Sequence, residues 1–136
     1  MKPEGTVFIV DDDAEVRQSL TRLLVSVDLP CQAFGSAKEF LDAYDPAQPG
    51  CLVLDVRMPG MSGIDLHKHL VAMGDPIPVI IITGHGDSQM AADALRRGAL
   101  SFLDKPVRPR QLLDQIRQAL AEDSRRRERD KKKRDE

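Results

Sequence analysis

The chain has 136 residues, of which 41% are hydrophobic and 31% are charged, a composition typical of one globular domain with its own core. Residues 123–136 hold eight Lys/Arg and five Asp/Glu, net +3, and the rest of the chain is net −5. An acidic body with a tail of mixed charge and no aromatic residue argues against a nucleic-acid-binding domain.

Strand-like and helix-like segments alternate along the chain. Short apolar runs between turn-forming residues predict buried strands at 6–10, 30–34, 51–54, 79–83 and 101–104. Apolar residues at helical spacing predict helices after Asp13, over 36–44, over 63–73, from Asp87 or Ser88 to Gly98, and from Pro109 onward. Each of four predicted helices has an apolar face that should point to the core. These faces are Val16, Leu20, Leu23, Leu24 and Val27 in the first helix, Phe40 and Leu41 in the second, Ile64, Leu66, Leu70 and Val71 in the third, and Leu112, Leu113, Ile116 and Leu120 in the fifth.

This alternation predicts βαβ units and a parallel sheet. Five such units fit a flavodoxin-like (βα)5 three-layer sandwich, an α/β fold whose strand order is 2-1-3-4-5. We assign residues 1–122 to this domain. Residues 123–136 form a charged linker or tail, either a helical extension or a disordered segment.

Polar side chains stand where four of the predicted strands end. Asp11 and Asp12 follow the first strand, Asp55 follows the third, Thr83 ends the fourth and Lys105 follows the fifth. Because the carboxyl ends of parallel strands meet at one edge of a sheet, we expect these side chains to lie together. Three close carboxylates either have raised pKa values or bind a cation, and oxygen ligands suit Mg²⁺.

The chemistry of this set is that of phosphoryl transfer. Asp55 is the candidate nucleophile, and a metal beside it would offset the developing charge. Thr83 and Lys105 can donate to phosphoryl oxygens, and Pro106 favours a cis bond that could aim the lysine inward. Each residue alone has an ordinary explanation, such as a strand end or a surface charge. The complete set, at matching strand ends, is what makes the signal specific.

Four segments carry a resemblance to a known family: 8–13, 53–60, 82–87 and 102–106. They resemble the receiver domain of bacterial two-component response regulators, and the similarity covers about residues 5–122. The stretches Thr-Gly-His-Gly-Asp and Gly-Ala-Leu-Ser-Phe-Leu-Asp-Lys-Pro are most similar to the FixJ-like (NarL/FixJ) class. The resemblance implies a signalling domain, not an enzyme, that takes a phosphoryl group from a sensor histidine kinase onto Asp55.

The resemblance also implies roles for the neighbouring residues. Asp12 is the direct Mg²⁺ ligand, Asp11 acts largely through water, and the carbonyl of Arg57 is a further ligand. Thr83 and Lys105 contact the phosphoryl group of the phosphorylated state.

Three more residues are expected to control that state. Phe102 takes the position of the switch aromatic, which moves after Thr83 is drawn to the phosphoryl group. Arg57 and His85 lie two residues beyond Asp55 and Thr83, where they would tune the dephosphorylation rate.

The expected output is homodimerisation through the face of the fourth helix, fifth strand and fifth helix. The fourth helix carries Met90, Ala91, Ala94 and Leu95 on this side, some of which must face the core. DNA would be bound only through a helix-turn-helix domain beyond this chain. The charged tail resembles the start of a linker to such a domain, which favours a fragment over a stand-alone receiver.

The cysteines and the N-terminus bear on location. Cys31 and Cys51 each begin an apolar segment without metal-ligand spacing, so we expect two small buried side chains in a reducing compartment. No secretion signal or membrane-length apolar run is present in the sequence. A cytoplasmic protein without a membrane partner is therefore expected.

Two alternatives remain open at this point. In a haloacid-dehalogenase-like phosphatase, Asp11 and Asp13 would form a D-x-D pair with Asp11 as the nucleophile. That reading leaves Asp55 without a role, and the chain has no late acidic pair or room for a cap domain. A degenerate receiver that only binds partners is disfavoured by the intact acidic set, Thr83 and Lys105.

Overall fold

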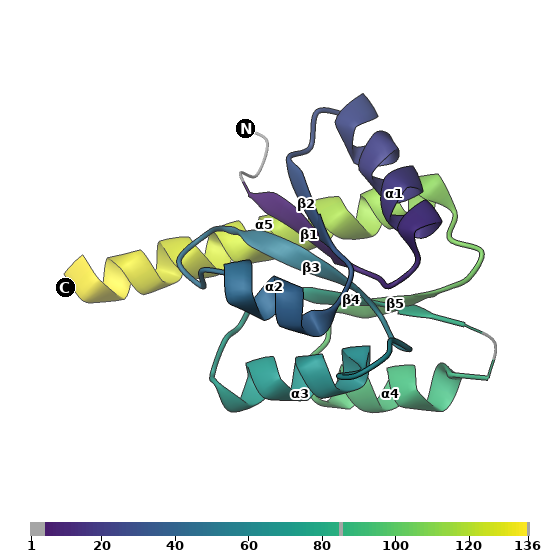
Figure 1. Cartoon of the computed structure of the whole chain (residues 1–136). Helices are drawn as coiled ribbons and strands as arrows, with labels where there is room; N and C mark the ends of the chain where they lie inside the picture. The colour runs from purple at the N-terminus through teal and green to yellow at the C-terminus, as the bar shows by residue number, and fades with distance from the viewer. Residues whose placement is uncertain (1–4, 85, 136) are drawn as a thin grey trace.

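The computed structural model describes residues 5–84 and 86–135, which form a three-layer sandwich (Figure 1). A parallel sheet of order β2-β1-β3-β4-β5 lies between two layers of helices, as predicted. The strands are β1 (Thr6–Val10), β2 (Cys31–Phe34), β3 (Gly50–Asp55), β4 (Val79–Thr83) and β5 (Ser101–Asp104). The helices are α1 (Ala14–Ser26), α2 (Ala37–Ala43), α3 (Gly63–Ala72), α4 (Ser88–Arg96) and α5 (Pro109–Asp135).

The apolar strands are continuous runs because the sheet is covered on both faces. In β1, Phe8 and Val10 join the core under α2, α3 and α4, whereas Val7 and Ile9 join the core under α1 and α5. Alternate side chains of a strand point to opposite faces, so one short strand supplies both cores.

Polar side chains cap the N-termini of three helices. Asp13, Ser36 and Ser62 are N-caps whose side chains accept backbone N–H groups of the first turn. Helix α4 begins at Ser88 and ends before Gly98, whose φ of 109° is accessible to glycine without strain.

The predicted inward face of α3 is wrong at one position. Val71 is 46% exposed, whereas His67 is buried beside the core. His67 lies three residues before Leu70 and three after Ile64, so it shares their face, while Val71 is rotated away from it.

The prediction that both cysteines are buried holds for Cys51 only. Burial raises the pKa of the Cys51 thiol to about 12, whereas Cys31 is half-buried.

Helix α5 continues without a break past the end of the sheet, through the charged segment (Figure 1). Asp123 is fully buried, and its Oδ2 accepts from the backbone N–H of Gly50 at 3.0 Å and from Nε of Arg127 at 2.9 Å. Arg127 also donates to the backbone carbonyls of Pro46, Ala47 and Gln48, each at 3.1 Å. The first turn of the charged segment is therefore fastened to the α2–β3 connection.

Within the described part of the chain, no helix combines the length and the apolar character needed to cross a membrane.

Candidate functional site

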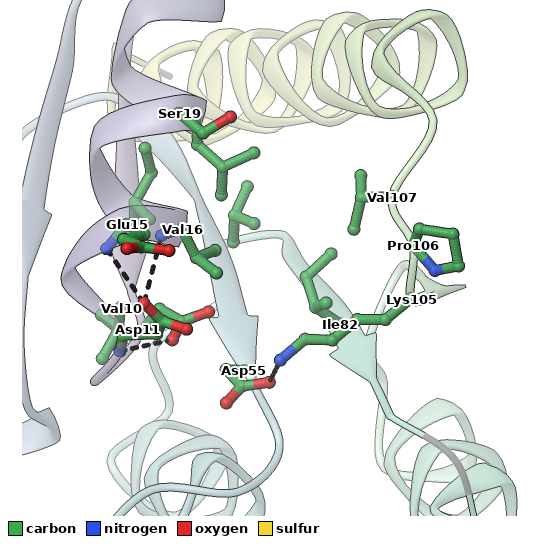
Figure 2. Close-up of a pocket in the computed structure, with 14 residues that line it drawn as sticks. Val10, Asp11, Glu15, Val16, Ser19, Asp55, Ile82, Lys105, Pro106 and Val107 are labelled. Atoms are coloured by element: carbon green, nitrogen blue, oxygen red, sulfur yellow. Dashed lines mark hydrogen bonds and ion pairs between the residues drawn. The ribbon is translucent and has the colours of Figure 1, made fainter.

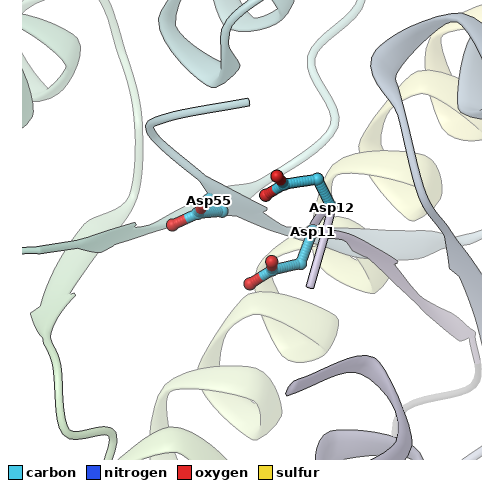
Figure 3. Close-up of side chains that lie close together, drawn as sticks. All are labelled: Asp11, Asp12 and Asp55. Carbon is cyan, nitrogen blue, oxygen red and sulfur yellow. The ribbon is translucent and has the colours of Figure 1, made fainter. Parts of the chain in front are cut away.

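Three carboxylates meet at the carboxyl edge of the sheet (Figure 3). Asp11 and Asp12 follow β1, and Asp55 is the last residue of the neighbouring strand β3. One oxygen from each of the three lies within 4.8 Å of the other two. The parallel pairing of β1 and β3 therefore produces the cluster that the strand ends predicted.

Burial makes this cluster electrostatically costly. Asp11 and Asp55 are only 3% and 5% exposed, and loss of hydration is the main reason that both pKa values are raised. Repulsion between the carboxylates raises these pKa values further. The site therefore favours a bound cation.

Lys105 compensates only part of this charge. Its Nζ lies 3.0 Å from Oδ1 of Asp55. This contact lowers the pKa of Asp55, but burial raises it by more, so the pKa of Asp55 is raised overall. Burial alone would lower the pKa of Lys105, but its hydrogen bond to Asp55 and the nearby carboxylates raise it. The ammonium group is therefore held charged beside Asp55. The Lys105–Pro106 peptide bond is cis, as the sequence suggested.

The donor chemistry of the cluster fits Mg²⁺. Its side chains offer only carboxylate oxygens, without a sulfur or imidazole ligand that would favour zinc. Asp12 is exposed, so water can complete the coordination that Mg²⁺ prefers.

A cavity of about 440 Å³ opens beside Asp55, between α1 and the β5–α5 connection (Figure 2). Asp11, Asp55 and Lys105 line its charged end, and apolar side chains that include Val16 and Val107 form a wall. The carboxylate of Asp55 and the ammonium of Lys105 are therefore both accessible from this cavity.

Thr83 and Phe102 lie on the neighbouring strands β4 and β5. Thr83 is fully buried at the end of β4, and its hydroxyl donates to Oδ1 of Asp104 at 2.7 Å. Phe102 is half-buried and packs against the core under α2, α3 and α4.

Arg57 makes a contact that the sequence did not indicate. Its Nε and Nη2 lie 2.8 and 2.7 Å from Oδ1 of Asp87, which joins the β3–α3 connection to the start of α4. The hydrogen bond from Arg57 lowers the pKa of Asp87. Asp87 occupies the N-cap position of α4 but makes no side-chain cap bond. His85, the other residue expected to tune dephosphorylation, lies outside the described residues.

Two neighbours of the predicted site residues were missed from the sequence: Asp87 and Asp104. Asp104 could have been found, because Thr83 and Asp104 are direct partners in the β4–β5 register once these strands are placed side by side. No local pattern indicated the pairing of Arg57 with Asp87, which are 30 residues apart.

The sandwich and the acidic edge beside a lysine define the class of protein as a receiver domain. Residues 7–117 match the family model described as the response regulator receiver domain, and the chain belongs to that family. This membership disfavours the phosphatase alternative.

Similar proteins agree with the FixJ-like prediction. The transcriptional regulatory protein TdiR of Thauera aromatica is 50% identical over 117 residues, which cover 86% of this chain and 52% of TdiR. The transcriptional regulatory protein FixJ of Bradyrhizobium diazoefficiens is 42% identical over 120 residues, 88% of this chain and 58% of FixJ. The structure of the response regulator StyR matches with a TM-score of 0.91 and 46% identity, over 96% of this chain and 66% of that one. The chain thus spans about half the length of these curated relatives.

Proposed function

We propose that this chain is the phosphoacceptor domain of a transcriptional response regulator and that Asp55 receives the phosphoryl group from a sensor histidine kinase in the cytoplasm. The observation that carries the proposal is the convergence of three carboxylates within 4.8 Å, with the ammonium of Lys105 3.0 Å from Asp55. Carboxyl groups with pKa values perturbed by burial and by like charges cluster at functional sites, so this arrangement points to function.

In the proposed reaction, an oxygen of Asp55 forms a bond to phosphorus while the phosphorus–nitrogen bond of the kinase phosphohistidine breaks. The electron pair of the broken bond stays on the imidazole, and Asp55 becomes an acyl phosphate. Lys105 and the Thr83 hydroxyl donate to the phosphoryl oxygens. Mg²⁺ held by Asp11, Asp12, Asp55 and the Arg57 carbonyl would supply positive charge against the transferred group.

The proposal is tested by intact-mass analysis after treatment with a small acyl phosphate and Mg²⁺. The wild-type chain should gain one phosphoryl group, and Asp55→Asn should gain none because the amide is not a nucleophile. Asp114→Asn, an exposed carboxylate on α5, is the matched control and should be labelled like the wild type. Labelling that persists in Asp55→Asn and disappears in Asp11→Asn would instead favour the D-x-D nucleophile.

For the output, we propose that phosphorylation shifts Thr83 and Phe102 and promotes homodimerisation through the face of α4, β5 and α5. Met90 and Leu95 are 38% and 37% exposed on α4, whereas Ala91 and Ala94 are buried and serve the core. A shift of a few kcal/mol is enough to repopulate two such states. DNA binding would belong to a further domain, because these relatives are named transcriptional regulatory proteins and this chain spans about half their length.

Beryllofluoride with Mg²⁺ mimics the aspartyl phosphate and should convert the chain to dimers. We expect a dimer dissociation constant of about 10 μM, which corresponds to a weak interface. Sedimentation measures this change. Met90→Lys should keep the chain monomeric by placing a charge in the apolar contact, whereas Met73→Lys, at a 61% exposed methionine that caps the C-terminus of α3, should not. Equal dimerisation of both variants would place the interface elsewhere.

We also propose that Arg57 tunes the lifetime of the phosphorylated state, together with His85. The ion pair with Asp87 holds the Arg57 side chain at the start of α4, two residues beyond Asp55 in the chain, and a change at Arg57 could therefore alter the access of water to Asp55.

A further inference from the structure

The hydroxyl of Thr83 is already committed to a partner. It lies 2.7 Å from Oδ1 of Asp104, an ordinary length for an O–H···O bond, and 3.4 Å from the carbonyl of Leu103. A threonine hydroxyl has one proton to donate, and a carboxylate is the stronger acceptor of the two. The proton therefore points to Asp104.

Strand pairing holds the two residues in this arrangement. Thr83 and Asp104 face each other in the β4–β5 register, and the N–H of Lys105 donates to the Thr83 carbonyl at 2.8 Å. The hydroxyl can therefore change its partner by side-chain rotation, without any change in strand register.

The two ends of the bond differ in exposure. Thr83 is 0% exposed, so its buried hydroxyl needs a hydrogen-bond partner, which in this structure is the Asp104 carboxylate. Asp104 is exposed, and its carboxylate can be rehydrated when the hydroxyl leaves. An exchange of acceptors is therefore reversible, with the cost set mainly by the strength of the Thr83–Asp104 bond.

On the basis of the proposed function, we propose that Asp104 is a positioning residue that holds Thr83 in the resting state. To donate to a phosphoryl oxygen on Asp55, the hydroxyl must leave the Asp104 carboxylate. Asp104 therefore competes with the phosphoryl group for one proton and opposes the active conformation. At Thr83 the change is the exchange of this one hydrogen bond, and no covalent bond of Thr83 or Asp104 forms or breaks.

The probe for this competition is beryllofluoride with Mg²⁺, whose affinity is measured by calorimetry. Asp104→Ala should bind the probe about three- to tenfold more tightly than the wild type, the range expected for one hydrogen bond. Asp104→Asn keeps an acceptor oxygen and should fall between the two. Asp114→Ala, an exposed carboxylate on α5, should bind like the wild type.

Removal of the Asp104 charge could also tighten binding of the anionic probe by simple electrostatics. The same substitution made in a Thr83→Ala variant separates this effect from the loss of the hydrogen bond. In Thr83→Ala, the hydroxyl is gone, so Asp104→Ala should add no further tightening. Equal tightening in both backgrounds would overturn the proposal, as would unchanged affinity in Asp104→Ala. If Asp104→Ala does not fold, Asp104→Asn in the same two backgrounds gives the same comparison. Failure of the wild type to bind the probe would count against the proposed function itself.

Discussion

Mg²⁺ should raise the melting temperature of the wild-type chain and leave that of Asp12→Ala unchanged. Binding to the folded state alone stabilises it by about 2.7 kcal/mol at 100 times the dissociation constant, or about 10 °C for a domain of this size. Asp12 offers its carboxylate to the cluster from an exposed position, so its loss removes a ligand without opening the core. The metal-free variant should melt at or above the wild type, because one repelling charge is gone.

Lower pH should partly replace the metal. Burial raises the pKa of Asp11 and of Asp55, so the folded state binds these protons more tightly than the unfolded chain does. Their contribution to stability is complete below the unfolded pKa of an aspartate and is lost as pH rises through the raised folded values. In EDTA, the two groups should therefore favour folding as the pH falls from neutrality, and the Mg²⁺ increment should shrink.

Calorimetry with and without EDTA, over a pH series, measures both effects. Asp114→Ala is the matched control and should respond to Mg²⁺ like the wild type. A full Mg²⁺ response in Asp12→Ala would remove this carboxylate from the metal site.

Asp123→Ala should lower the free energy of unfolding by about 2–4 kcal/mol. The substitution leaves the buried N–H of Gly50 without its acceptor and removes the carboxylate shared by Arg126 and Arg127. The two arginines are 20% and 27% exposed, so water can solvate them in part and the loss should stay below that of a fully buried ion pair.

Urea unfolding of Asp123→Ala against Asp130→Ala measures this effect. Asp130 is 55% exposed on the same helix, and its removal should change stability by less than about 0.5 kcal/mol. A chain that ends at residue 122 should lose as much stability as Asp123→Ala. If Asp123→Ala unfolds at the wild-type urea concentration, the fastening of the charged segment contributes nothing to stability.

The alternation of strands and helices in the sequence was sufficient to predict the fold class, and the strand order known for that class brings Asp11, Asp12, Asp55 and Lys105 together. Local periodicity reveals which segments are strands and helices, and a parallel sheet then brings the strand ends to one edge. The helix limits at Asp13, at residue 36 and at Gly98 were also predicted, because a helix end is satisfied by residues near it in the chain. The prediction that Val71 faces the core was wrong, because an apolar residue near the edge of a helical face can point to the core or to solvent.

Only the tertiary structure decided which polar groups pair across the fold. Arg57 and Asp87 are 30 residues apart, and Asp123 and Gly50 are 73 apart. The sequence predicted a charged linker or tail over residues 123–136, yet Asp123 is buried and satisfied by hydrogen bonds. Hydropathy measures the cost of removing a side chain from water, whereas a hydrogen bond offsets that cost only where folding brings a donor within about 3 Å. Which donor comes this close depends on how the helices and strands pack, so no periodic pattern in the sequence indicates it.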